Sequence, residues 1–537
     1  MFKCSLFFLF LICCFFNLIL TVESVEDKDI IILENKNISL LDACTVYENA
    51  TREDIRKCYI TNTKEIKLHP SDSISNENVN ILPLPSSINI KDFVNLTIWK
   101  SKVKSNNIPE NGYFQVVEPS FASNGTVIFY TGNHFAARSE IGKEWKYVNP
   151  YFDFKGKVPV GTHEVPKFMD LFWADQRAIY DPIHNIYIWL RQGEPFSQHF
   201  GQILNNDRLA ISKDAIKWKV YDLFPNRIFP KLYENSSKLI FDYPQLALSQ
   251  KYLYLTTSLN DANKTYSTIF RFSLNDLGNF TTVRYDVILD KNLKGVEPVQ
   301  GIGPNNTMYF GGHIPNLKYG MKIYQWNENA KTPESYQMPI TLWNDMRNSK
   351  YCGNDSKLWW CQSKYIDSRI RSAWLYNNSI NFLWNAIITY DNGKTWVPYI
   401  DVATFNLAEN ITYERKYYLA DKKVGWMYGT AIPNKNGQLG IFAHYSTNNN
   451  THPYLNLAFG IFNHTNNKWD ITPLINSTHP LPTINDNREK TFDWGDFLTI
   501  REHSKNSTND DFKCDAGGYV LVGNSSKAVD PYFIMVK

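Results

Sequence analysis

The chain has 537 residues, a formal net charge of only +3 and 20% charged residues. No basic tract interrupts this balance, which argues against nucleic acid as a partner because nucleic-acid-binding domains carry a clustered basic surface. Aromatic residues reach 15% of the chain, a bias that favours strands over helices. Even without its apolar start the chain is long enough for a large core or several domains.

Residues 1–24 have the layout of a secretory signal peptide. Lys3 precedes a nearly uninterrupted apolar run from Ser5 to Val22, and small Ser24 offers a cleavage point. The run also reaches the lower limit for a membrane span, about 18 residues, so a retained signal anchor stays open as the alternative. Either way we expect the rest of the chain outside the cytosol, secreted or held at a membrane surface by the uncleaved start.

The sequons and the cysteine spacing also indicate a location outside the cytosol. Asn-x-Ser/Thr sequons run from Asn37 to Asn524 and predict N-glycosylation on many surface loops. Two close cysteine pairs predict local disulfide loops in an oxidising compartment, namely Cys44 with Cys58 and Cys352 with Cys361. Cys514 is left over, either as a free thiol or as an intermolecular link. Because no CxxC occurs, zinc is a poor alternative for these cysteines.

Residues 25–110 differ in amino-acid composition from the rest of the mature chain. They are polar and rich in Asn and Ser, and Phe93–Trp99 is their clearest candidate strand. We interpret them as a lead segment with a disulfide loop, placed before one large unit that spans 111–537.

Within 111–537, short apolar runs alternate with Asn, Gly and Asp turns, and helical periodicity is almost absent. The runs group into seven similar units of about four strands, whose starts lie about 55 to 75 residues apart. These units open at Tyr113, Ala174, Asp242, Val296, Arg369, Trp426 and Asp493. A four-stranded unit cannot bury both of its faces alone, so such units must stack. The pattern predicts an all-β fold, a six- or seven-bladed β-propeller with four-stranded antiparallel blades, in preference to serial β-sandwiches.

The last unit is short. We therefore expect an N-terminal strand near Phe93–Trp99 to complete it and to close the ring.

One motif carries a family resemblance. Thr389–Trp396 (Thr-Tyr-Asp-Asn-Gly-Lys-Thr-Trp) resembles the Asp box of the sialidase-like β-propellers. Its Asp and Gly suit a tight turn, and its Trp suits packing between blades. Degenerate copies at Ser139–Trp145, Ser212–Trp218 and Asn463–Trp469 are expected at corresponding places, between the later strands of their units. The resemblance implies that the box is a folding element and takes no part in catalysis.

Ligands of a propeller usually meet the axial opening, near the starts of the innermost strands. The candidate ligand-binding residues there are Gln176, Arg177, Arg369, Arg371 and Asp493, and the candidate catalytic residues are Asp175, Tyr243, Glu297 and Asp496. Arginines can hold a sugar carboxylate through two parallel hydrogen bonds, and carboxylates can act as acid, base or nucleophile. The sialidase resemblance implies a Tyr nucleophile with a Glu partner, for which Tyr243 and Glu297 are candidates. The Phe/Tyr-Arg-Ile-Pro motif of sialidases is absent.

These observations predict a secreted, glycosylated propeller, expected as a monomer, that binds a glycan or another extracellular ligand such as a protein at its axial face. A sialidase-like glycoside hydrolase is the first alternative, and a surface-anchored protein-interaction scaffold is the second. We expect no cofactor and no metal. The sequence has no Gly-x-Ser-x-Gly, His-Glu-x-x-His, phosphate-binding or dinucleotide-binding motif.

Overall fold

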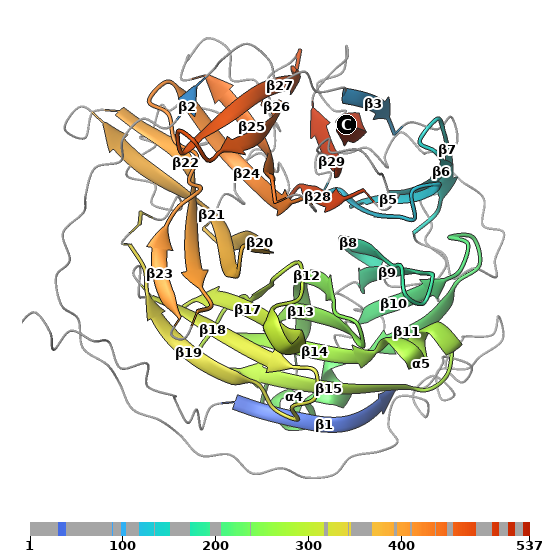
Figure 1. Ribbon diagram of the computed structural model, residues 1–537. Helices are drawn as coiled ribbons and strands as arrows, with labels where there is room; N and C mark the ends of the chain where they lie inside the picture. The colour runs from blue at the N-terminus through green and yellow to red at the C-terminus, as the bar shows by residue number, and fades with distance from the viewer. Residues whose placement is uncertain are drawn as a thin grey trace, which may run out of the picture.

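The computed structural model describes residues 30–38, 88–89, 98–103, 118–133, 135–150, 172–193, 206–236, 238–315, 320–341, 343–344, 368–390, 395–408, 411–434, 437–447, 455–478, 497–503, 514–520 and 530–536. Their strands form seven antiparallel blades of four strands each, arranged around a central axis as a β-propeller (Figure 1). The predicted fold class is confirmed, with seven blades.

The blades are numbered in chain order, and the strands of each are given from the axis outwards. Blades 1 to 3 are β4 (Ser120–Ser123), β5 (Val127–Gly132), β6 (Phe135–Glu140), β7 (Glu144–Val148); β8 (Phe172–Asp181), β9 (Ile186–Gly193), β10 (Asp207–Ser212), β11 (Lys219–Leu223); and β12 (Ile240–Leu248), β13 (Tyr252–Asn260), β14 (Thr265–Ser273), β15 (Val283–Asp290). Blades 4 and 5 are β16 (Glu297–Pro298), β17 (Thr307–His313), β18 (Gly320–Asn327), β19 (Glu334–Pro339); and β20 (Ile370–Tyr376), β21 (Ser379–Tyr390), β22 (Thr395–Asn406), β23 (Thr412–Arg415). Blades 6 and 7 are β24 (Val424–Pro433), β25 (Leu439–Thr447), β26 (Asn456–Asn463), β27 (Lys468–Ile475); and β28 (Thr499–Glu502), β29 (Cys514–Val520), β30 (Asp530–Val536) with β3 (Ile98–Lys102).

The helices of the described chain are short and lie outside the blade sheets. Blade 2 is followed by α3 (Pro225–Ile228) and α4 (Pro230–Ser236), and blade 3 contains α5 (Leu274–Asn279) between β14 and β15. A 3₁₀ turn at Pro304–Asn306 precedes β17. None of the helices in these ranges has the length and apolarity needed to cross a membrane.

Ring closure comes from the N-terminal part of the chain. β3 pairs antiparallel with β30, so that a strand from before the first blade lies in one sheet with the last strand of the chain. This confirms the expected closing strand, although it spans Ile98–Lys102 and overlaps the predicted range only at its end. Two further strands from 25–110 add to blade edges: β1 (Ile30–Ile38) pairs with β15, and β2 (Ile88–Asn89) pairs with β27. In Figure 1, β1 lies along the outer edge of blade 3.

The core lies between neighbouring blades. All eight residues of β9 are buried, because this middle strand faces a blade on each side. Tryptophans join adjacent blades, as the degenerate motif copies predict. The Trp218 ring of blade 2 lies 4.8 Å from the Phe129 ring of blade 1. The Trp469 indole of blade 6 donates a 3.0 Å hydrogen bond to the Tyr417 carbonyl, which precedes that blade.

The clearest motif lies at an unexpected place. Thr389–Trp396 joins β21 to β22, the second and third strands of blade 5, whereas the three degenerate copies join third to fourth strands. The expectation of corresponding places is therefore not met. The motif specifies the conformation of a tight turn between two antiparallel strands. The same turn can join any two neighbouring strands of a blade, so the motif does not predict which two. The side chains of 389–396 lie outside the described residues.

The turn of blade 2 has the contacts expected of such a motif. The Asp214 carboxylate accepts hydrogen bonds from the Ile216 and Lys217 amides at 2.8 Å each and from the Ser212 hydroxyl at 2.9 Å. Its carboxylate therefore closes the turn from inside.

Of the cysteines beyond residue 24, only Cys514 falls within the described ranges. It is free and 1% exposed. The predicted pairs Cys44–Cys58 and Cys352–Cys361 lie outside these ranges and stay predictions.

Candidate functional site

Four of the innermost strands have irregular registers near the axis. The register shifts lie in β8 between Phe172 and Gln176, in β12 between Asp242 and Gln245, in β20 between Ile370 and Ser372, and in β24 between Met427 and Thr430. Two of these shifts contain a tyrosine at positive φ, Tyr243 at 57° and Tyr428 at 53°. An extra residue in a strand redirects side chains, and bulges of this kind are frequent beside functional sites. A left-handed backbone at a bulky residue stores strain that the surrounding packing must hold.

Side chains from six blades, three of them within these register shifts, meet near the axis. We call them the axial cluster, which consists of Arg177, Tyr243, Glu297, Arg369, Arg371, Tyr428 and Phe497. One or two members come from each of blades 2 to 7, with Phe497 lying two residues before β28 of blade 7. All are buried except Arg369, which is partly exposed.

Arg177 links three blades across the axis. Its Nε donates a 2.9 Å hydrogen bond to the Pro244 carbonyl of blade 3. Its guanidinium carbon lies 3.1 Å from the centroid of the Phe497 ring, a cation–π contact. Burial lowers the pKa of Arg177, and the nearby Tyr243 and Glu297 partly oppose that effect. Among the described residues its buried Nη2 has no hydrogen-bond partner.

Tyr243 is the meeting point of the two arginines from blade 5. The Arg369 guanidinium lies 4.2 Å from the centroid of its ring, and the Arg371 guanidinium lies 5.7 Å from it. The Tyr243 hydroxyl donates a 3.3 Å hydrogen bond to the Ile370 carbonyl, which lies between these arginines in the chain. Three predicted residues from two separate units, Tyr243 from one and both arginines from the other, therefore lie close together.

Glu297 is 5% exposed at the start of β16. Burial raises its pKa to about 8, against the opposing effect of Arg177 and Arg371. The side chain is therefore mostly protonated at neutral pH, as a hydrogen-bond donor without charge. Its Oε2 has no hydrogen-bond partner within the described parts of the chain.

The other predicted site residues have different places. The Gln176 amide nitrogen donates to the carbonyls of Gly132 and Phe135, and its oxygen accepts from the Trp189 indole at 2.8 Å. Gln176 thus joins blade 2 to blade 1 and does not face the cluster. Asp175 is partly exposed and contributes to the electrostatics of Arg177. Asp493 and Asp496 lie outside the described residues and stay predictions.

Sequence reasoning missed Phe497 and three further ionisable residues in or near this centre. Arg501 donates to the carbonyls of Phe121 at 3.1 Å and Ala178 at 2.9 Å, and burial with the nearby Arg177 lowers its pKa to about 9. Tyr428 lies 5.8 Å from the Arg371 guanidinium carbon, measured to the ring centroid. The one available signal for it was the glycine that follows Tyr428 inside an otherwise apolar strand, since such a glycine indicates a bulge.

The third of these ionisable residues is Asp207, at the start of β10. It is fully buried, and within the described ranges neither of its carboxylate oxygens has a hydrogen-bond partner. Burial raises the pKa of Asp207 well above its ordinary value, and the nearby Asp175 and Asp242 raise it further. Across these ranges no group of three or more His, Cys, Asp and Glu side chains is arranged to hold a metal ion.

The axial cluster combines three guanidinium groups with one carboxyl group. Its arginines come from blades 2 and 5, while its one carboxyl group is held neutral at neutral pH by burial. Guanidinium groups donate in a planar fork that matches a carboxylate or a sulfate. The fold and the site together define a seven-bladed β-propeller with an arginine-rich centre.

No protein-family model and no curated protein sequence matches the chain. Among solved structures it is similar to an ulvan lyase, a polysaccharide lyase, with a TM-score of 0.43 and 11% identity over 80% of this chain and 94% of the lyase. It is also similar to the α-L-arabinanase of Cellvibrio cellulosa, with a TM-score of 0.29 and 12% identity over 56% and 95% of the two chains. For the α-L-arabinofuranosidase of Podospora anserina the TM-score is 0.27, with 9% identity over 55% and 90%. Likeness at this level is distant and assigns no activity to this chain.

Proposed function

We propose that the axial face of the propeller binds an anionic glycan and that the arginines of the axial cluster hold its carboxylate or sulfate group. The supporting observation is the convergence of Arg177, Arg369 and Arg371 on Tyr243. Arg369 is the partly exposed member and is the first to meet a ligand. Asp175, also partly exposed, lies near Arg177 and contributes to its electrostatics.

Binding to matched pairs of oligosaccharides tests this proposal. Each pair holds a uronate-, sialate- or sulfate-bearing glycan and its neutral counterpart, and affinity is measured by calorimetry. We expect preference for the anionic member and a loss of about ten- to a hundredfold for Arg369→Ala, since a hydrogen bond to a charged group contributes about 1.5–3 kcal/mol. Arg369→Lys should recover only part of the loss, because lysine lacks the planar fork.

Arg208→Lys is the control. Arg208 lies on β10 in an ion pair with Asp222, with Nε and Oδ1 2.6 Å apart, outside the axial cluster. Its variant should bind like the wild type. The proposal is abandoned if no anionic glycan binds more tightly than its neutral counterpart.

A sialidase-like glycoside hydrolase is the second candidate, and one observation favours it. Glu297, with a pKa raised to about 8, is in the protonated form that a general acid requires at neutral pH. Tyr243, the candidate nucleophile of the sialidase resemblance, lies in the same cluster. Turnover of aryl glycosides with anionic sugars would support this activity if Tyr243→Phe and Glu297→Gln each abolished it while binding persisted.

We also propose that the protein acts outside the cytosol, on the strength of its apolar start and its sequons. N-terminal sequencing of the product from a secreting host tests cleavage near Ser24. An intact Met1 terminus would favour the anchored alternative.

A further inference from the structure

The most exposed large apolar side chains of the described residues are three isoleucines. Ile141 is 43% exposed, Ile183 is 62% exposed and Ile216 is 60% exposed. Each lies at a strand-to-strand turn: β6–β7 in blade 1, and β8–β9 and β10–β11 in blade 2. Strands of a blade alternate in direction, so turns after first and third strands all open on one face of the ring. This is the face opposite to the starts of the innermost strands.

Two hydrogen bonds hold the three turns next to one another. The Arg138 Nε of blade 1 donates to the Asp214 carbonyl in the Ile216 turn at 3.2 Å. The Lys213 ammonium, in the same turn, donates to the His184 carbonyl in the Ile183 turn at 2.6 Å. The three isoleucines and their turns therefore form one surface, which we call the isoleucine face.

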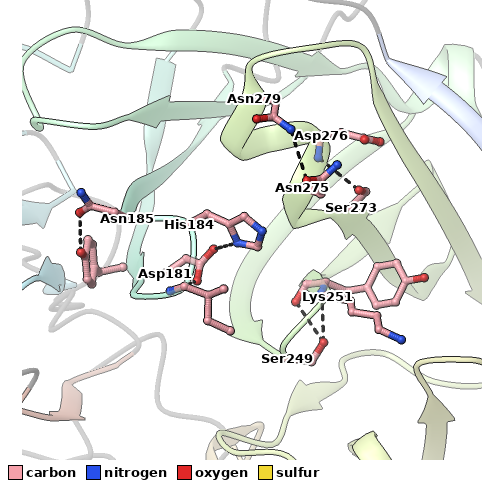
Figure 2. Close-up of polar contacts among 12 residues, drawn as sticks. Asp181, His184, Asn185, Ser249, Lys251, Ser273, Asn275, Asp276 and Asn279 are labelled. Carbon is pink, nitrogen blue, oxygen red and sulfur yellow. Dashed lines mark hydrogen bonds and ion pairs between the residues drawn. The ribbon is translucent and has the colours of Figure 1, made fainter.

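The Ile183 turn is firmly held by its polar residues. The Asp181 carboxylate accepts from the Ile183 amide at 2.9 Å and lies 2.6 Å from the His184 Nδ1. The Tyr180 hydroxyl donates to the Asn185 side chain at 2.6 Å. Figure 2 shows the His184 ring directed towards α5 of blade 3, against which it packs; a Cβ on Gly278 would lie 3.1 Å from the His184 Cβ. Ile183 is exposed in this turn, together with Pro182 and Asn185, and it is the large apolar side chain among the three.

The Ile141 turn is strained. Ile141 has φ of 52°, a left-handed conformation that is a genuine outlier for a β-branched residue. An exposed isoleucine adds little to the core, and Asn or Gly would fit this backbone better. Strain held at an exposed apolar side chain indicates that the side chain serves a purpose other than folding.

Lysines surround the isoleucine face. The exposed ones are Lys143, Lys213, Lys217 and Lys219. Acids also lie around this face: Glu140 pairs with Arg138 at 3.3 Å, the Asp214 carboxylate accepts hydrogen bonds inside its own turn, and Glu144 is exposed beside the Ile141 turn. The surface is therefore apolar at its turn tips, and basic residues outnumber acidic ones around them.

We propose that the isoleucine face docks on an anionic lipid surface outside the cytosol, with the three isoleucines in the interfacial layer and the lysines beside the headgroups. Apolar tips with flanking lysines match the requirements of interfacial binding. A protein partner fits less well, because protein interfaces are enriched in aromatic residues and arginine and depleted in lysine.

Sedimentation with vesicles tests the proposal, using full-length protein produced without N-glycans because the Asn124 sequon lies in the β4–β5 turn on the same face. We expect binding to vesicles of phosphatidylcholine with phosphatidylserine, weakening with added salt, and little binding to phosphatidylcholine alone. Ile183→Asp and Ile216→Asp should each weaken binding by roughly tenfold or more. Ala262→Asp is the control: this exposed residue lies in the β13–β14 turn, on the other face, and its variant should bind normally.

Ile141→Asn separates docking from folding. It should raise thermal stability by relieving the backbone and yet weaken vesicle binding, a combination that a purely structural role would not produce. The proposal is overturned if wild-type protein does not prefer anionic vesicles, if the Ile183 and Ile216 variants bind as the wild type does, or if the face captures only a protein partner.

Discussion

Glu297→Gln should change how the stability of the protein depends on pH. In the folded chain burial raises the pKa of Glu297 from 4.5 to about 8, whereas in the unfolded chain it returns to its ordinary value. Between these values the folded state holds a proton that the unfolded state has lost, so the wild type loses stability as pH rises. Glutamine keeps the shape and the neutral charge but cannot ionise, so the variant lacks this loss.

The magnitude is set by the shift. One pKa unit corresponds to about 1.4 kcal/mol, so a rise from 4.5 to about 8 corresponds to at most about 5 kcal/mol. Arg177 and Arg371 already oppose the shift, and their effect is contained in that value. We expect the variant to gain a few kcal/mol on the wild type between about pH 4.5 and pH 8 and nothing further above it.

Urea unfolding at several pH values across this window measures the difference. Glu334→Gln is a control of opposite sign, because the Tyr336 hydroxyl and the Gln325 amide donate to this exposed carboxylate and hold its pKa below the ordinary value. The Glu334 carboxylate contributes to the free energy of unfolding above the pKa it has in the unfolded chain, and this contribution is lost as pH falls. Parallel stability curves for wild type and Glu297→Gln would refute the burial argument.

Three other features lead to predictions. Trp326→Ala should destabilise the fold by about 3–5 kcal/mol in urea unfolding, because the indole is fully buried and lies 6.2 Å from the Tyr254 ring of the preceding blade; a loss below about 1 kcal/mol would contradict its packing role. Cys514, 1% exposed and with a pKa that burial raises well above the ordinary value, should resist thiol reagents until the protein is unfolded, and rapid labelling of folded protein would show otherwise. Burial lowers the pKa of His444 to about 3, so its imidazole signals should not titrate between about pH 5 and 8 by NMR, and a transition near pH 6.5 would disprove its burial.

The blade pattern was readable from the sequence because it is local. Short apolar runs indicate strands, and clusters of Asn, Gly and Asp indicate turns. The seven unit starts predicted from these patterns fall close to the first strands of the seven blades. The closing strand could be inferred from a count, since the last unit was short. The register of this strand with β30 could not be inferred, because the paired residues Ile98 and Val536 lie far apart in the sequence.

The axial site was only partly readable. Arg177, Tyr243, Glu297, Arg369 and Arg371 were named because charged residues near unit starts converge on a propeller axis, and the structure brings them together. Gln176 was named on the same reasoning and faces blade 1 instead.

Adjacent strand residues point to opposite sides, and a register shift decides which of them meets the axis. Tyr428 was missed because its place also depends on a register shift. Its φ of 53° belongs to that shift, and the local sequence gives little indication of it.

By itself, the sequence determined the element type, a repeat of six or seven four-stranded units and several of the residues that lie near the axis. These depend on side-chain periodicity and turn chemistry, which act over a few residues. Tertiary structure alone decided which strands flank the Thr389–Trp396 turn, which side chains the bulges direct inwards, and how burial raises the pKa of Glu297 to about 8. These depend on contacts between blades that lie far apart in the chain, where desolvation and neighbouring charges set the energy.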